Sequence, residues 1–465
     1  YVKAIVEALV AADANRQPAD LKLNMGAFAE DIPVAFNRAW EAYAANKDTE
    51  NIDHANWHLA VDREMVQLSA HREDGSPLGL MNFFAVHTTS VHSDKRSIST
   101  DNKGWAATKQ EHDQALAGNK DFVALYCQAA AGDVTPNFKR HPGKKETRGV
   151  SPDDFEAMRI NGGFQQSLSD ELLVRASQSE MSSEPPVLDS ILAYVDMTNI
   201  PCDPEFTNND KNARTGQALL GVGFMRGTRE GEGVHGLIPY LATQISKSRK
   251  LEQPLRHGPK VPVINCTERT QLGEPFGKTF LPSFIAPDLK VIKQWAKNAA
   301  IGPQPLSPNI LPVQIFIIGS LAIAALPTEP TTVVGRRIRA TLEAVLVDRG
   351  VKRVVLKGYA NAYSGYTTTF EEYQLQGYEA SSTHFGQWTC AAYRTVLRDL
   401  ALELCKRPED RTPYSELRPH DFSQRELNRR QYIPKKRFNH AKEPLPPVWR
   451  EGASWHLLNT EPEED

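Results

Sequence analysis

Short apolar runs rich in branched and aromatic residues recur along the chain, and each predicts a buried strand. The run at 313–327 carries Gly319 and Ser320 at its centre, which indicates a hairpin. Apolar residues spaced three and four apart predict helices between these runs. The strands are expected at 78–88, 121–127, 190–197, 313–327 and 351–359, and the helices at 1–14, 170–178, 333–348 and 389–406. The mixture indicates an α/β fold, or an α+β fold, of mixed buried β-sheets flanked by helices.

Two stretches lack this periodicity. Residues 138–165 are basic and carry Gly and Pro, which predicts a surface loop, while residues 406–465 are rich in Pro, Arg and Glu. We expect one domain over 1–405, followed by an extended tail over 406–465 without strands. No internal repeat is visible in the sequence.

Composition excludes some classes of protein. The net charge of −3 over 465 residues gives no electrostatic case for binding nucleic acid. The five cysteines form no C-x-x-C pair, which argues against a zinc finger, and their odd number leaves at least one unpaired. A pairing of Cys202 with Cys266 is conceivable, but sequence does not decide it. Because the chain starts at Tyr1 inside a helical pattern, we expect it to be processed or a fragment.

Polar side chains with catalytic potential follow several of the predicted strands. His87 ends one run, Glu329 follows another, and a tyrosine-rich segment begins after the strand at 351–359. Each has an ordinary structural explanation: a packed histidine, an acid beside a helix start, or tyrosines that pack in the core. Ligands of α/β proteins bind beyond the carboxyl ends of strands, so these groups could also converge there. His nitrogen with carboxylate oxygen suits zinc.

The turn after the strand at 121–127 contains a hydroxyl group that also has a structural and a functional explanation. Its sequence, GDVTPN, combines residues that set sharp backbone angles and places Thr135 on a constrained bend. The turn is either an ordinary loop or one built to hold that hydroxyl in place.

At the level of whole segments, the chain resembles the neutral (alkaline, non-lysosomal) ceramidases, zinc-dependent amidases that cleave ceramide to sphingosine and a fatty acid. The resemblance runs from Tyr1 to about residue 405 and rests on long segments in the family's order. These are FVALYCQAAAGDVTPN, GLMNFFAVHTTSVHSDKRSISTDNKGWAA, PVQIFIIGSLAIAALPTEPTTVVGRRIR and NAYSGYTTTFEEYQLQGYEASSTHFG.

The resemblance implies a set of functional positions and a substrate class. By position, it implies zinc binding by His87, Glu329 and Tyr366, and catalytic roles for Thr135, Tyr378 and Arg38. It implies ceramide or another N-acyl lipid as substrate, and it allows a peripheral contact with a membrane surface. It also implies a secreted or periplasmic protein, or one facing the outside of a membrane.

Departures from the family pattern keep a second function open. The family's first zinc-ligand His belongs to a segment that nothing in residues 1–60 resembles, so either the chain begins downstream of it or the site is incomplete. Thr135 stands where the family has Ser, and Glu329 has altered flanking residues. The family's C-terminal β-sandwich is expected to be absent or replaced. The alternative is a non-catalytic or weakly active protein of this fold that has lost part of the zinc site.

Overall fold

The structure is a computed structural model. It describes residues 2–95, 98–178, 186–233, 236–248, 256–266, 305, 307–421, 448–451 and 454–457.

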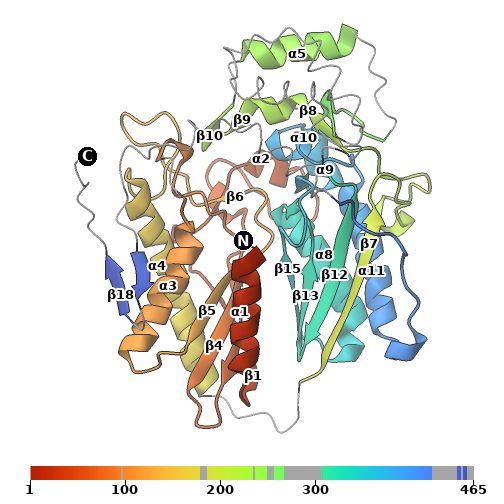
Figure 1. The fold of residues 1–465 in the computed structure, drawn as a ribbon. Coiled ribbons are helices and arrows are strands. Elements are labelled where there is room, and N and C mark those ends of the chain that lie inside the picture. Colours follow the sequence, from red (N-terminus) through yellow and green to blue (C-terminus); the bar gives the residue numbers. More distant parts are fainter. Residues whose placement is uncertain are drawn as a thin grey trace.

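Two four-stranded mixed sheets form the centre of the fold (Figure 1). The first has the order β1 (Asp20–Ala27), β3 (Glu64–His71), β4 (Pro77–Phe84), β5 (Val123–Gln128). The second has the order β7 (Leu188–Asp196), β12 (Ile310–Ile318), β13 (Leu321–Ala325), β15 (Arg353–Lys357). The predicted hairpin at 313–327 is confirmed, and Gly319 takes the positive φ of 59° that its turn requires.

The two sheets repeat one connectivity, although the sequence shows no repeat. In each, the first three strands are antiparallel neighbours and the fourth pairs parallel with the third. A helix crosses between the parallel strands: α3 (Asp101–Leu116) in the first half and α8 (Thr332–Leu346) in the second. Parallel strands end at the same edge of a sheet, so each half brings two carboxyl ends together.

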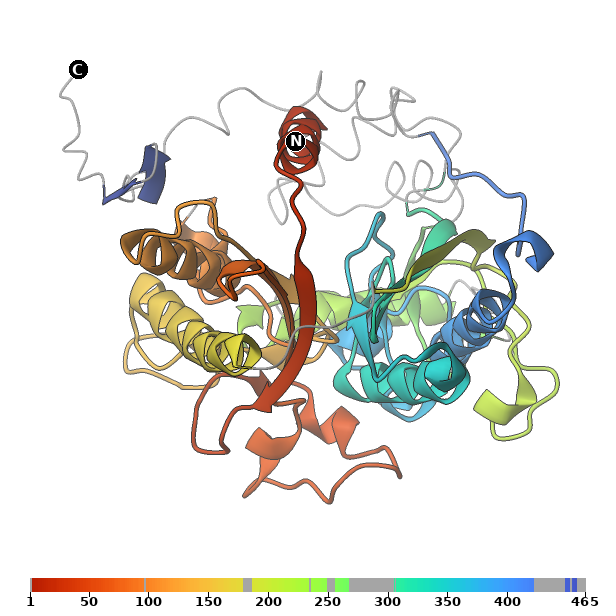
Figure 2. The same ribbon diagram turned by 90° about the horizontal axis from the view of Figure 1, so that it is seen from below.

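Helices cover the outer face of each sheet, and the inner faces pack on each other (Figure 2). The helices α3 and α4 (Asp154–Ser177) lie on the first sheet, whereas α8 and α11 (Thr389–Leu404) lie on the second. Between the sheets, Val66 and Phe83 belong to one buried cluster with Ile323 and Val355. This face-to-face packing sets the strand ends of one half against those of the other.

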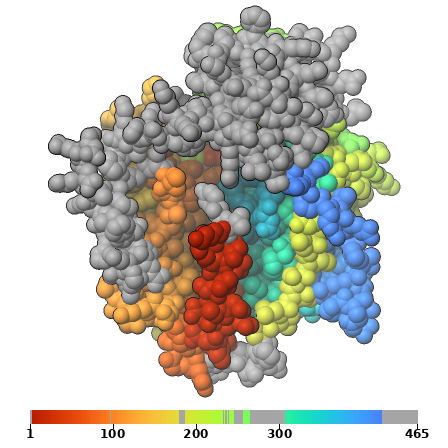
Figure 3. Space-filling model, viewed as in Figure 1, coloured from red at the N-terminus to blue at the C-terminus, as the bar shows by residue number. Residues whose placement is uncertain are grey.

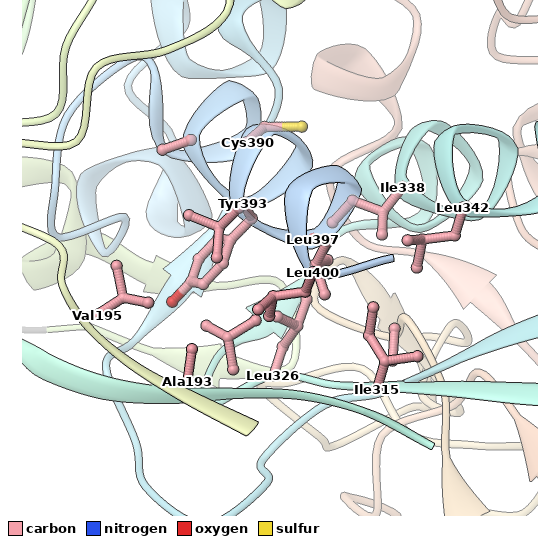
Figure 4. Close-up of a cluster of buried hydrophobic side chains, with 14 of the residues drawn as sticks. Ala193, Val195, Ile315, Leu326, Ile338, Leu342, Cys390, Tyr393, Leu397 and Leu400 are labelled. Atoms are coloured by element: carbon pink, nitrogen blue, oxygen red, sulfur yellow. The ribbon is translucent and has the colours of Figure 1, made fainter. Parts of the chain in front are cut away.

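The largest core cluster lies between the second sheet and its helices (Figure 4). Tyr393, Leu397 and Leu400 of α11 face Ile338 and Leu342 of α8 and the sheet beneath them. All of these side chains are buried, because α11 and α8 each carry apolar residues three or four positions apart on the face that packs inward. The predicted helices at 333–348 and 389–406 are therefore confirmed to within a few residues.

The structure corrects the boundary between a predicted loop and a predicted helix. The loop expected over 138–165 gives way at residue 154 to α4, which is much longer than the helix expected at 170–178. The Asp153 side chain caps α4 by accepting a hydrogen bond from the Glu156 N–H. The Asn161-Gly162-Gly163 triplet resembles a turn in sequence, yet Gly162 lies inside the helix. A Cβ there would come 2.7 Å from the Asn102 carbonyl oxygen, so the glycine lets α3 and α4 pack closely.

The remaining sequence expectations have mixed outcomes. The helix expected at 1–14 is confirmed as α1 (Val2–Ala14), whereas β1, β3 and α3 were not anticipated. All five cysteines are free, including Cys202 and Cys266. Within 406–465, the described residues include a short hairpin of β17 (Val448–Glu451) and β18 (Ser454–Leu457), where no strand was expected. The division of the chain at residue 405 stays a prediction.

Helix α1 lies on the surface in front of the two halves (Figure 3). Its apolar side chains Ile5, Val6, Leu9 and Val10 are exposed. Among the helices that the structure describes, none combines the length and the apolar character needed to cross a membrane.

We expect Leu400→Ala to lower the free energy of unfolding by about 2–5 kcal/mol, because it leaves a cavity between α11 and its neighbours. Leu402→Ala on the same helix is the matched control, since that side chain is 49% exposed, whereas Leu400 is 0% exposed. Urea unfolding followed by circular dichroism measures both. Equal losses in the two variants would contradict this assignment of the core.

Candidate active site

A cavity of about 1180 Å³ opens where the strands of the two halves end. Its wall includes residues that follow β4, β13 and β15, together with a Gly-rich segment at 227–233. Charged and phenolic side chains dominate this part of the wall: Arg38, His87, Glu230, Glu329, Tyr359, Tyr366 and Tyr378. Polar groups that converge in a large concave cavity are typical of an active site.

The Glu329 carboxylate is the centre of one cluster in this cavity. One carboxylate oxygen lies 2.9 Å from His87 Nε2 and accepts a hydrogen bond of 2.7 Å from the Tyr359 hydroxyl. The other oxygen accepts a hydrogen bond of 2.5 Å from the Tyr363 hydroxyl. His87 comes from the first half and the other three residues from the second, so the cluster joins the two halves.

Short backbone pairings hold His87 and Glu329 in place. The backbone N–H of His87 and its ring Nδ1 both lie within hydrogen-bonding distance of the Val134 carbonyl oxygen, at 3.1 and 2.8 Å. Nδ1 thereby donates, which leaves Nε2 to face Glu329. Glu329 belongs to β14 (Glu329–Pro330), which pairs in parallel with β16 (Tyr366–Thr367), so Tyr366 lies beside it on the neighbouring strand.

The Glu329 carboxylate is ionised near neutral pH despite its burial. Burial alone would raise its pKa, but the hydrogen bond and charge of His87 and the hydrogen bonds from Tyr363 and Tyr359 lower the pKa to about 2. Burial also raises the pKa of the Tyr359 hydroxyl, and the neighbouring charge of Glu329 raises it further, so this phenol stays neutral. The cluster therefore combines an ionised carboxylate with the His87 ring and with neutral phenols.

Arg38 forms the centre of a second cluster. Its guanidinium donates to Glu230 at 2.5 Å, to Glu379 at 2.8 Å and to the Tyr366 hydroxyl oxygen at 3.0 Å. It also lies over the ring of Tyr378, with 5.7 Å between the guanidinium carbon and the ring centroid. Arg38 is thus a buried cation held between two carboxylates, in contact with both tyrosines that the sequence singled out.

Thr135 lies behind the wall of the cavity, beside Glu230. Its strand, β6 (Val134–Thr135), pairs with β2 (Phe36–Asn37), the segment that leads directly into Arg38. The Thr135 hydroxyl donates to the Glu230 carboxylate and accepts a hydrogen bond of 2.9 Å from the Asn137 N–H. The side chain is only 2% exposed, and its hydrogen-bond partner Glu230 lines the cavity.

Gly132 sets the distance between the Thr135 turn and Glu329. Its N–H donates to the Pro330 carbonyl oxygen at 2.8 Å, and its own carbonyl oxygen accepts from Arg38 at 3.0 Å. A Cβ at this position would lie 2.6 Å from the Glu329 carbonyl oxygen, closer than real Cβ contacts allow. The close backbone approach thus requires glycine.

The donors of the first cluster are of a kind that zinc accepts. Nδ1 of His87 donates a hydrogen bond to a backbone carbonyl oxygen, which is the usual arrangement of a histidine that binds metal through Nε2. Nε2 already faces an ionised carboxylate, so a nitrogen and an oxygen ligand fit. In the part of the chain that the structure describes, no group of three or more His, Cys, Asp and Glu side chains could hold a metal ion. Further ligands would have to be phenols or lie outside this part.

The structure brings all six residues expected from sequence into neighbouring clusters. The tyrosines that contact the Glu329 carboxylate are Tyr359 and Tyr363, whereas the hydroxyl of Tyr366 contacts Arg38. Sequence reasoning gave a role to Tyr366 but none to Tyr359 or Tyr363, which it placed only in the tyrosine-rich segment. It missed Glu230 altogether, whose only local signal is its place in the Gly-rich stretch GTREGEG.

We expect Gly132→Ala to lower the free energy of unfolding by about 1–3 kcal/mol, because the new methyl group pushes β14 away from the Thr135 turn. Urea unfolding measures the change. Gly236→Ala is the control, since a Cβ at Gly236 meets nothing within 4 Å. A Gly132→Ala variant as stable as this control would contradict the close approach.

The chain is similar to known proteins over most of its length. Residues 1–395 match the family model described as neutral/alkaline non-lysosomal ceramidase, N-terminal. The neutral ceramidase of Pseudomonas aeruginosa is 32% identical over 412 residues, which cover 87% of this chain and 54% of that protein. Neutral ceramidase B of Dictyostelium discoideum is 31% identical and covers 85% of this chain and 54% of its own length. The chain thus spans about half the length of these curated relatives.

Solved structures give the same result for the fold. The structure described as a ceramidase complexed with C2 matches with a TM-score of 0.71 and 29% identity, covering 91% of this chain and 58% of that one. The crystal structure of the Pseudomonas aeruginosa neutral ceramidase matches with a TM-score of 0.66 and 28% identity, covering 91% of this chain and 57% of its own. These matches confirm the predicted α/β fold, and the chain belongs to the neutral/alkaline non-lysosomal ceramidase family.

Proposed function

We propose that this chain carries the catalytic site of a zinc-dependent amidase that hydrolyses the N-acyl bond of ceramide or of a related N-acyl lipid. One observation carries this proposal. The His87–Glu329 pair lines the same cavity as Arg38 and Glu230, and Glu230 accepts a hydrogen bond from Thr135. Side chains that could hold a metal, a cation and a hydroxyl group near one another are a combination that supports amide hydrolysis. Membership of the ceramidase family supports the substrate class.

In this proposal His87, Glu329 and Tyr366 hold the zinc ion. Bound zinc supplies a Lewis acid and lowers the pKa of a coordinated water to about 7. The chain's own contribution is to orient the ligands: Val134 fixes the His87 ring, and Tyr359 and Tyr363 fix the Glu329 carboxylate. The burial of this cluster strengthens each of these interactions by excluding water.

Thr135, Arg38 and Tyr378 provide the remaining catalytic groups. The Thr135 hydroxyl is the nucleophile for the amide carbon, or a donor to the oxyanion that forms there. Arg38 brings a positive charge close to this hydroxyl, and the ring of Tyr378 lies against Arg38. Burial raises the pKa of the Tyr378 phenol, which therefore stays neutral. In this proposal both side chains stabilise the negative charge that forms on the carbonyl oxygen.

A second candidate function is a binding protein of the same fold with little or no catalysis. The absence of a three-residue His, Cys, Asp and Glu cluster among the described residues favours it, as does Thr135 in the place of a Ser. Measurements of the zinc content and of N-acyl hydrolysis distinguish the amidase from the binding protein.

Substitutions of Thr135 test the role of the hydroxyl. We expect Thr135→Ala to lower the rate of N-acyl hydrolysis at least a hundredfold, because the reacting oxygen is lost. Thr135→Ser keeps the oxygen and removes a methyl group that restricts the side chain, so turnover is expected to stay or to rise. Release of fatty acid from a short-chain ceramide measures both. Unchanged hydrolysis by Thr135→Ala would refute the proposed role.

Metal analysis tests the zinc site directly. We expect about one zinc per chain in the purified protein, loss of N-acyl hydrolysis with a chelator, and recovery on adding zinc. His87→Ala should lower the zinc content because it removes the nitrogen ligand, whereas His54→Ala, at an exposed position away from the cavity, should not. Full hydrolysis after complete removal of metal would disprove the zinc site.

A further inference from the structure

Glu230 is a buried carboxylate that none of the roles above includes. It is 7% exposed, lies in the Gly-rich segment 227–233 and lines the cavity. One carboxylate oxygen accepts from Arg38, and the other accepts from the hydroxyls of Thr135 and Thr89 and from the Asn137 side-chain amide. A charge this well surrounded by donors on both oxygens is held in one orientation.

The contacts of the Thr135 hydroxyl follow from what a hydroxyl can do. Such a group has one hydrogen to donate and two lone pairs that accept. The hydrogen points to Glu230, and one lone pair accepts from the Asn137 N–H at 2.9 Å. Among the residues that the structure describes, this oxygen has no further hydrogen-bond partner, so a single lone pair is left for an incoming group.

The charge state of Glu230 suits an acceptor. Burial alone would raise its pKa, but the charges of Arg38 and His87 and the hydrogen bond from Thr135 hold the pKa below its ordinary value. The carboxylate therefore stays ionised near neutral pH and accepts the hydroxyl hydrogen. A neutral carboxylic acid could instead donate to the oxygen and occupy its free lone pair.

We propose that Glu230 is a positioning residue for Thr135: its carboxylate, anchored by Arg38, accepts the hydrogen bond of the hydroxyl and thereby directs the one free lone pair of Oγ1 toward the substrate carbonyl. This inference rests on the proposed amidase function. It extends that function, because it assigns to Arg38 the additional task of anchoring the carboxylate that orients the nucleophile. A displacement of about 1 Å at a reacting atom can cost a hundredfold in rate, which sets the size of the expected effect.

The test compares two carboxylates that share Arg38. Glu230→Gln replaces the carboxylate that contacts both Arg38 and Thr135, whereas Glu379→Gln replaces a carboxyl group that contacts Arg38 at 2.8 Å and is not a hydrogen-bond partner of Thr135. Hydrolysis of a short-chain ceramide by the purified, zinc-loaded protein gives kcat and KM. We expect Glu230→Gln to lower kcat about a hundredfold with KM within about twofold, and Glu379→Gln to lower kcat less.

Two further measurements separate positioning from a structural role. The Glu230→Gln variant should bind a non-hydrolysable amine analogue of ceramide as tightly as the unaltered protein. Glu230→Asp keeps the negative charge beside Arg38 but withdraws it by one methylene, so it should fold even if the Gln variant does not. We expect Glu230→Asp to lower kcat at least tenfold, again with little change in KM.

The outcomes are distinguishable. An unaltered protein that hydrolyses no N-acyl lipid overturns the amidase proposal and this inference with it. An active protein in which Glu230→Gln and Glu230→Asp turn over as fast as the original, or faster, overturns the inference alone. Equal losses in Glu230→Gln and Glu379→Gln also overturn it, because the effect would then act through Arg38 rather than through Thr135.

Discussion

The burial of the Glu329 carboxylate is the constraint on which the rest of the site depends. A buried charge is costly unless cations or several donors surround it. Here the donors come from His87 at the end of β4 and from Tyr359 and Tyr363 after β15. Only the face-to-face packing of the two sheets brings these segments within hydrogen-bonding distance, so the charge and the fold stabilise each other.

The repeated connectivity of the two halves explains where the chemistry lies. In each half, the segment between a parallel strand and its crossover helix supplies one central residue: His87 between β4 and α3, and Glu329 between β13 and α8. The two segments meet through the Thr135 turn, which contacts His87 through Val134 and β14 through Gly132. One turn thus positions the proposed metal ligands and the proposed nucleophile together.

Sequence patterns located most of the second sheet and its helices, because long apolar runs and regular helical spacing leave little ambiguity. They failed where a residue serves a contact that is remote in sequence. Gly162 resembles a turn residue but allows α3 and α4 to pack closely. The polar helix α3 carries no clear apolar stripe, and part of its polar surface is buried against α4.

The sequence by itself determined the fold class, the family and the approximate positions of the strand ends that carry His87, Thr135 and Glu329, because these depend on local periodicity and on long motifs. Only the tertiary structure decided the partners: Tyr359 and Tyr363 rather than Tyr366 contact the Glu329 carboxylate, and Glu230 holds the Thr135 hydroxyl. Glu230 lies 95 residues from Thr135 in the chain. No local pattern encodes such a contact, because it arises from the packing of separate loops around shared buried charges.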